Sequence, residues 1–170
     1  MPLSKIQTTT GTAEPGQLGR TLIHEHVLIG YPGWELDARA PKFKRNDAMI
    51  RAVDQMHELQ SHGVETFVDP CPMDFGRDPV FLAELSQKSG MRIICTTGAY
   101  FEAEGNTYTF RHMPMEELVE IYIQEIEQGI NDRSWIIFRF GTLQYDRSCR
   151  STGGQVERGQ GVRIDRLARD

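Results

Sequence analysis

Short apolar runs alternate with segments of helical periodicity along the first 132 residues, and this alternation restricts the fold more than any other feature of the sequence. The runs predicted to be strands are rich in apolar and β-branched residues and lie at residues 21–23, 64–68, 91–96 and 135–138. The segments predicted to be helices lie between residues 46 and 63, between 78 and 90, and from about 115 to 128. Strands that alternate with helices of this length form parallel βα units, so the chain is predicted to be α/β, with about four such units.

The predicted helices are bounded by residues that favour helix ends. Asn46 or Asp47 is the expected N-cap of the first helix. Asp78 is the expected N-cap of the second, with Pro79 at the first helical position and Gly90 after the end. The apolar faces expected to point into the core comprise Met49, Ile50, Val53, Met56 and Leu59, then Phe81, Leu82 and Leu85, and finally Leu118, Tyr122 or Ile123, and Ile126.

Length and composition exclude several classes of protein. The chain has 170 residues and a formal charge of -5, which argues against a generally basic, nucleic-acid-binding surface. No apolar run approaches the roughly 20 residues that span a bilayer, and no charged-then-apolar leader opens the sequence. Cys71, Cys95 and Cys149 are few and far apart, as expected in a reducing compartment. We therefore expect a cytoplasmic protein with no membrane or nucleic-acid partner.

The composition changes near residue 132. From Arg133 onward the sequence has eight arginines and no lysine, although both types occur before it. Beyond Gly141 the sequence is rich in glycine, poor in apolar residues and without periodicity, so it offers little apolar surface to offset the entropy of ordering. A closed eight-stranded barrel needs about 250 residues. Length alone thus favours an open sheet or half of a larger barrel.

The sharpest local motif is His24-Glu25-His26, at the end of the first predicted strand. Residues two apart on a strand point to the same face, so both imidazoles are able to approach one ion, and zinc accepts such ligands. The alternative is an ordinary polar pair at a strand end. The other histidines are expected to be surface residues: His57, His62 and His112.

Two further segments follow predicted strands. Asp69 and Asp74 come after the second strand and are candidates for a catalytic carboxylate or one that supports a metal ligand, although Asp-Pro is also a common strand ending. Residues 96–100, with the sequence TTGAY, either offer backbone N–H groups and the phenol of Tyr100 to a ligand or form a turn. Neither a Gly-rich nucleotide loop in strand-to-helix context nor a Gly-x-Ser-x-Gly motif is present.

Four blocks, in this order and spacing, resemble the phosphotriesterase family of the amidohydrolase superfamily from about residue 3 to residue 132. The blocks are residues 19–27 (GRTLIHEHV), 63–72 (GVETFVDPCP) with 76–78 (GRD), 93–100 (IICTTGAY) and 125–130 (EIEQGI). The resemblance implies a (β/α)8 TIM-type barrel, of which this sequence carries the amino-terminal half. It also implies a centre of two divalent metal ions, most typically zinc, at the carboxyl ends of the strands.

The resemblance assigns roles to three residues of this sequence. His24 and His26 match the two histidines that bind the more buried ion in the family, and Tyr100 falls where lactonase-like members carry a tyrosine near the substrate. The implied reaction is hydrolysis of a small-molecule ester (a phosphotriester, lactone or carboxylic ester) by a metal-activated hydroxide.

The sequence departs from the family after Asp132. Arg139 aligns with the lysine whose carbamate bridges the two ions, and a guanidinium is a poor nucleophile for carbon dioxide. Of six expected ligands, His24 and His26 alone are present. We therefore expect residues 1–142 to form a partial phosphotriesterase-like barrel and residues 143–170 to be a disordered tail unrelated to the family.

Two origins for the departure stay open. A reading-frame slip near Asp132 explains both the altered composition and the lost ligands; the alternative is a genuinely diverged short protein. Sequencing the coding DNA distinguishes them. Either way, we expect little or no activity.

The alternative to a hydrolase is a non-catalytic fragment or pseudoenzyme that self-associates through open barrel edges. A third reading, a metal-dependent deoxyribonuclease of the same superfamily, is disfavoured by the acidic pI and by the extended blocks.

Overall fold

The computed structural model of the chain describes residues 5–100 and 107–130. Its centre is a parallel sheet with the strand order β3-β4-β5, made of β3 (Thr21–Leu22), β4 (Thr66–Asp69) and β5 (Arg92–Cys95). Helix α1 (Arg45–Ser61) connects β3 to β4, and α2 (Pro79–Ser89) connects β4 to β5. The predicted parallel βα units are therefore confirmed for this part of the chain. The expected strand at residues 135–138, Arg139 and the expected tail at 143–170 lie outside the described residues.

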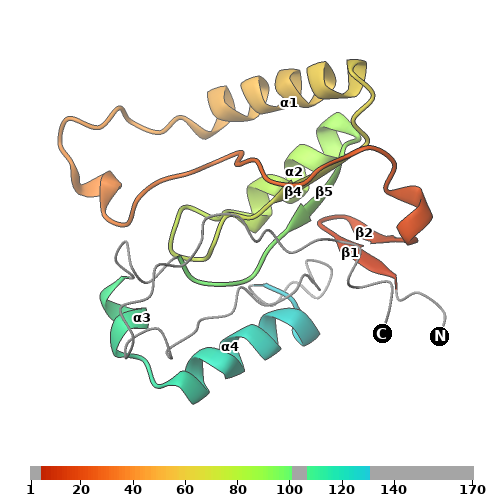
Figure 1. The fold of residues 1–170 in the computed structure, drawn as a ribbon. Coiled ribbons are helices and arrows are strands. Elements are labelled where there is room, and N and C mark those ends of the chain that lie inside the picture. The colour runs from red at the N-terminus through yellow and green to blue at the C-terminus, as the bar shows by residue number, and fades with distance from the viewer. Residues whose placement is uncertain (1–4, 101–106, 131–170) are drawn as a thin grey trace, which may run out of the picture.

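The two faces of the sheet are covered by different elements. Phe67 and Ile93 pair across β4 and β5 and pack in one core cluster with apolar residues of α1 and α2. Val68 and Ile94, the next pair in the register, point to the opposite face and pack against Ala13. The central residues of both strands are apolar, in keeping with burial on both faces. Figure 1 shows α1 and α2 lying together on one side of the strands.

The second face is covered by a β-hairpin that was not predicted. Strands β1 (Ile6–Thr8) and β2 (Gly11–Ala13) pair antiparallel, and the N–H of Thr9 in the turn donates to the carbonyl of Ile93 at 2.8 Å. Strands of three residues are too short to give a periodic signal, so their pairing is visible only in three dimensions. Two short 3-10 helices follow in the chain, at Pro15–Gln17 and Trp34–Leu36.

The boundaries of α2 follow the sequence closely, whereas the start of α1 does not. Asp78 caps α2 by accepting a 2.9 Å hydrogen bond from the N–H of Phe81, and Gly90 ends the helix at a φ of 72°. Helix α1 instead begins at Arg45, with Lys44 at the N-cap and no side-chain cap bond. The predicted cap at Asn46 or Asp47 was therefore wrong. Asp47 lies in the first helical turn, where its negative charge is favourable.

The apolar faces of the helices were predicted in most positions. Met49 and Met56 of α1 are buried, but Ile50 is 62% exposed and Ala52 takes its place in the core. In α4 (Met115–Gln128), Leu118 and Tyr122 are buried and Ile123 is exposed, which decides between the two alternatives for that position.

One short helix was not predicted. Helix α3 (Tyr108–His112) precedes α4, and its five residues make it too short to give a helical period. Within the described ranges, none of the helices has the length and apolar character needed to cross a bilayer.

Candidate metal centre

Four residues gather where β3 and β4 end, and we call them the strand-end cluster: His24, His26, Asp69 and Cys71. Because β3 ends at Leu22, both histidines lie beyond the strand, and the argument from alternating strand faces does not apply to them. Their rings are nevertheless adjacent, with centroids 5.7 Å apart and planes at 87°. The N–H of Glu25 donates to the carbonyl of Val68 at 3.4 Å, which holds the segment between the histidines against β4.

Asp69 lies at the base of this cluster. It is the last residue of β4, and its side chain is 2% exposed. Its Oδ1 accepts from the N–H of Cys71 at 2.9 Å, and its Oδ2 accepts from the N–H of Val27 at 3.2 Å. Burial raises the pKa of the Asp69 carboxyl above its ordinary value, although these two N–H groups and His26 act in the opposite direction. Asp69 thus connects β4 to the histidine segment.

Cys71 is part of the cluster but is bound to carbonyl groups. Potential ligand atoms of His26, Asp69 and Cys71 lie within 4.8 Å of one another. However, the Cys71 thiol donates to the carbonyls of Phe75 and Leu28 at 3.1 and 3.4 Å, and burial raises its pKa to about 12. Metal binding requires a thiolate, so the imidazoles are the suitable ligands in this cluster.

Both described cysteines should resist alkylation in the folded chain. Burial raises the pKa of Cys71 and of Cys95 to about 12, so each is almost entirely a thiol at pH 8. We expect iodoacetamide to modify them about 1000-fold more slowly than in the denatured chain, with the rate rising about tenfold per pH unit as the thiolate fraction grows. Peptide mapping by mass spectrometry measures both rates. Equal rates in the folded and denatured chains would contradict this prediction.

Aromatic side chains adjoin the histidines. The ring of Phe75 stacks on Tyr100, with centroids 4.3 Å apart and planes at 6°. The same ring meets His26 edge-on at 6.4 Å and Tyr31 edge-on at 4.8 Å. Tyr100, the substrate-binding candidate from the sequence, is therefore connected to the strand-end cluster through Phe75. No motif pointed to Phe75 or Tyr31, because only the folded chain brings them together.

The segment after β5 uses its backbone donors internally. The N–H of Tyr100 donates to Oδ1 of Asp74 at 2.7 Å, and the N–H of Ala99 donates to the hydroxyl of Tyr122 at 3.1 Å. The N–H groups of Ala99 and Tyr100 are therefore already bonded within the fold, and residues 96–100 form neither a helix, a strand nor a regular turn. Asp74 supports Tyr100 through this bond, while its Oδ2 is buried and has no hydrogen-bond partner in the described residues.

A buried ion pair fixes α4 beside this region. The side chains of Arg77 and Glu125 are 6% and 14% exposed, and Nη2 of Arg77 lies 2.5 Å from Oε1 of Glu125. Arg77 also donates to the carbonyl of Thr96 at 2.9 Å, and the hydroxyl of Thr97 hydrogen-bonds to Glu125. Burial acts to lower the pKa of Arg77, but the hydrogen bonds and charge of Glu125 outweigh it and raise that pKa. The pair ties α4 to the carboxyl end of β5.

The loops after β3 and β4 meet at two glycines. The N–H of Gly30 donates to the carbonyl of Phe75 at 3.1 Å. Gly76 has a φ of 93°, and a Cβ placed on it would lie 2.9 Å from the backbone nitrogen of Gly30. Both the positive φ and this close approach require glycine at position 76.

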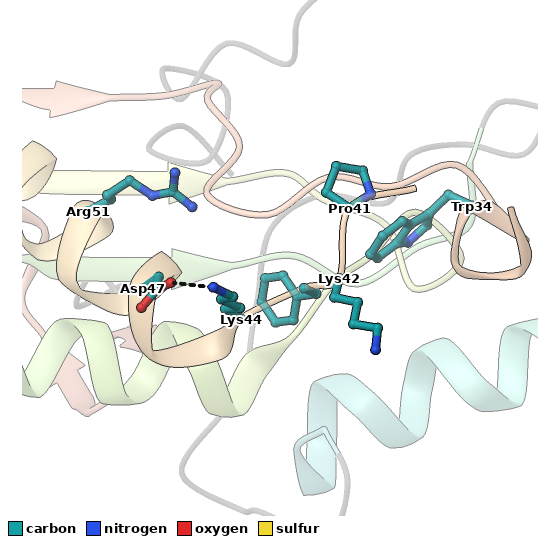
Figure 2. A pocket seen from close by; sticks show the side chains of 7 residues that line it. Trp34, Pro41, Lys42, Lys44, Asp47 and Arg51 are labelled. Atoms are coloured by element: carbon teal, nitrogen blue, oxygen red, sulfur yellow. Dashed lines mark ion pairs between the residues drawn. The ribbon is translucent and has the colours of Figure 1, made fainter. Parts of the chain in front are cut away.

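A separate hollow of about 290 Å³ opens beside the start of α1, and Figure 2 shows it at close range. Its lining combines two aromatic rings with four charged side chains and a proline, and consists of Trp34, Pro41, Lys42, Phe43, Lys44, Asp47 and Arg51. Lys44 pairs with Asp47 across 3.9 Å. No member of the strand-end cluster lines this hollow, so the candidate centre is identified by its chemistry and not by a cavity.

The other histidines lie on the surface, as expected. His57 is an exposed residue of α1, and His62 at the end of that helix is also exposed. His112 is exposed at the end of α3, where its ring lies 4.3 Å from that of Tyr108. None of the three lies in the strand-end cluster.

The parallel βα sheet with an imidazole pair at its carboxyl edge fits part of a TIM-type barrel, and the comparisons with known proteins agree. Residues 4–143 match the Phosphotriesterase family, and the chain belongs to that family. A Deinococcus radiodurans PTE-like lactonase, solved in a multiply substituted form, aligns with a TM-score of 0.69 and 35% identity, covering 78% of this chain and 42% of its own.

Two relatives with similar sequences are named for different hydrolytic activities. The N-acetyltaurine hydrolase of Salmo salar is 32% identical over 151 residues, covering 74% of this chain and 43% of its own. The aryldialkylphosphatase of Saccharolobus solfataricus is 30% identical over 118 residues, covering 69% of this chain and 37% of its own. This chain thus spans less than half the length of these relatives. The predicted family and the partial TIM-type barrel are confirmed.

Proposed function

We propose that this chain carries part of the centre of a divalent-metal-dependent hydrolase that acts on small-molecule esters, with His24 and His26 as the metal ligands. The observation that carries this proposal is the adjacent imidazole pair, 5.7 Å between centroids, at the carboxyl edge of a parallel sheet in a member of the Phosphotriesterase family. The names of the relatives, an aryldialkylphosphatase and a PTE-like lactonase, favour phosphotriesters and lactones as substrates.

The residues present suit zinc. Neutral imidazoles are good ligands for zinc, and the rings of His24 and His26 lie next to each other, so both can approach one ion. When bound, the metal would lower the pKa of a water molecule and polarise the phosphoryl or carbonyl oxygen of the substrate. The stacked rings of Phe75 and Tyr100 would then form an apolar wall for the aryl or acyl group of the substrate.

Three further proposals concern the level of activity, the domain boundaries and the cellular location of the chain. The described residues contribute two imidazoles to the centre, so we expect weak metal binding and low turnover from this chain alone. We propose that residues 1–142 act as the partial barrel and 143–170 as a separate tail. Two free, buried cysteines, Cys71 and Cys95, favour the reducing cytoplasm as its location.

Elemental mass spectrometry of the purified chain tests the metal ligands. After equilibrium dialysis against excess zinc, we expect about one equivalent of bound zinc in the chain and less than about one tenth in the His24→Ala/His26→Ala variant, because an open site with no imidazole holds zinc poorly. His57→Ala is the matched control, since His57 is an exposed residue of α1. Equal metal in the chain and in the double variant would contradict the proposal.

Hydrolysis assays then test the substrate class. The panel comprises an aryl phosphotriester, a lactone, an aryl carboxylic ester and N-acetyltaurine, each with and without added zinc. Turnover of the amide alone would replace the ester assignment. Turnover that is unaffected by chelation or by the double histidine variant would argue against this centre altogether.

The second candidate is a non-catalytic chain that self-associates. It is favoured by exposed apolar side chains in the segment after β3, namely Ile23, Ile29, Tyr31 and Leu36. Exposed apolar patches beside a sheet edge mark association surfaces. Light scattering after size exclusion distinguishes the candidates: a monomer with bound zinc supports the hydrolase, and a zinc-free oligomer supports the association module.

A further inference from the structure

We propose that Asp69 is the positioning residue for His26: its carboxylate accepts from Nδ1–H of that ring and leaves Nε2 for the metal. This inference rests on the proposed function, because it assigns a role toward the metal that His24 and His26 would hold. Carboxylate groups that orient metal-binding imidazoles in this way raise the affinity of the ligand set and fix its geometry.

Asp69 is held in place by protein groups. The residue ends β4 in the middle of the described sheet, and its side chain is almost completely buried. Each carboxylate oxygen accepts a backbone N–H, from Cys71 at 2.9 Å and from Val27 at 3.2 Å. A carboxylate held by two main-chain donors cannot rotate freely, so it is a rigid acceptor for a third group.

The ring of His26 presents Nδ1 to this acceptor. Nδ1 lies 3.5 Å from Oδ1 of Asp69 and is buried, yet it makes no hydrogen bond with any of the described residues. A buried donor without a partner is costly, and a shift of about half an ångström would give a hydrogen bond of ordinary length. With Nδ1 committed to Asp69, Nε2 is the remaining nitrogen able to bind a metal.

The same carboxylate also holds the main chain beside the ring. Val27, whose N–H binds Oδ2, directly follows His26 in the sequence. One side chain on β4 thereby restrains both the backbone and the imidazole of a residue that lies beyond the end of its own strand. This explains how an irregular segment can present a ligand in a defined orientation.

The neighbouring groups do not offer the same support. The thiol of Cys71 donates to two carbonyl oxygens. Asp74 accepts from the N–H of Tyr100, and within the described part of the chain it makes no hydrogen bond or ion pair with His26. Among the described side chains around His26, the carboxylate of Asp69 is therefore the acceptor that faces Nδ1.

Zinc affinity provides the first test, measured by competition with a chromogenic chelator on the full chain. We expect Asp69→Asn to weaken zinc binding about 10- to 100-fold, since an amide keeps the size of the side chain but loses the charge that orients the ring. Asp78→Asn is the matched control, because it makes the same change at another aspartate that accepts a backbone N–H and lies outside the strand-end cluster; its zinc affinity should be unchanged. Zinc binding by Asp69→Asn equal to that of the unmodified chain would overturn the inference.

The tautomer of His26 provides a second test that needs no metal. Long-range nitrogen–proton NMR spectra of the metal-free chain should show His26 as the Nδ1–H tautomer at a pH where the ring is neutral, and His24→Ala and His26→Ala assign the signals. An Nε2–H tautomer at His26 would overturn the inference. If the unmodified chain binds no zinc, the proposed function fails, whereas the tautomer still decides whether Asp69 orients the ring.

Discussion

Replacing Glu125 with alanine is expected to lower the free energy of unfolding by about 3–5 kcal/mol, because it leaves a buried guanidinium without its counter-ion. Arg77 is 6% exposed and would lose the 2.5 and 2.9 Å bonds to the two carboxylate oxygens of Glu125. The hydroxyl of Thr97 would lose its acceptor as well. Urea unfolding followed by far-ultraviolet circular dichroism measures the loss.

Two further variants separate the ion pair from the helix that carries it. Glu127→Ala, an exposed position of the same helix, should change the free energy of unfolding by less than about 0.5 kcal/mol. Arg77→Met/Glu125→Leu should be less destabilised than Glu125→Ala, since removing both charges leaves no ion unpaired. Should Glu125→Ala and Glu127→Ala prove equally stable, the ion pair does not hold α4 in place.

Replacing Phe81 with alanine is expected to lower the free energy of unfolding by about 3–5 kcal/mol, through lost apolar burial and the cavity that remains. Phe81 is a residue of α2, is 0% exposed and lies in the main core cluster with residues of α1 and the sheet. The guanidinium of Arg45 also lies 5.2 Å from the centroid of its ring, so the variant loses a cation–π contact between α1 and α2.

The matched control for Phe81→Ala is Ile50→Ala, because Ile50 is an exposed apolar residue of α1. We expect that variant to change the free energy of unfolding by less than about 0.5 kcal/mol. Both should shift the urea midpoint without changing the slope if unfolding remains two-state. A small loss for Phe81→Ala would mean that the α1–α2 layer does not form one cooperative unit with the sheet.

The elements that could be predicted from sequence are those whose signals are local. Helix α2 has its cap, its first-turn proline and its terminal glycine within its own segment, and each behaves in the structure as its chemistry predicts. The predicted start of α1 was wrong because the chain already turns into the helix after Lys44. The preference of Asn46 or Asp47 for the N-cap position does not delay that start. The β1–β2 hairpin packs against Val68 and Ile94, and this packing cannot be predicted from strands of three residues.

Some residues of the candidate centre could likewise be predicted from the sequence, and others could not. His24 and His26 could be found from a three-residue motif, and Asp69 from its place after a strand, although the strand proved to include it. The role of Cys71 as a thiol donor to carbonyls, and the stack of Phe75 on Tyr100, depend on loops that meet only in the fold. Arg77 and Glu125 are 48 residues apart, beyond the reach of any periodic pattern.

The contact between Gly30 and Gly76 bears on how such proteins are engineered. The loop after β4, which carries Phe75, crosses the loop after β3 at these glycines, and Gly76 has no space for a side chain there. The two loops therefore have to be exchanged together. If only one of the two loops were transferred into a related barrel, it would not fit against the other loop at the Gly30–Gly76 contact and would displace it. Mutant libraries for this region should therefore keep Gly30 and Gly76 and vary the exposed positions that follow Gly30, such as Tyr31 and Leu36.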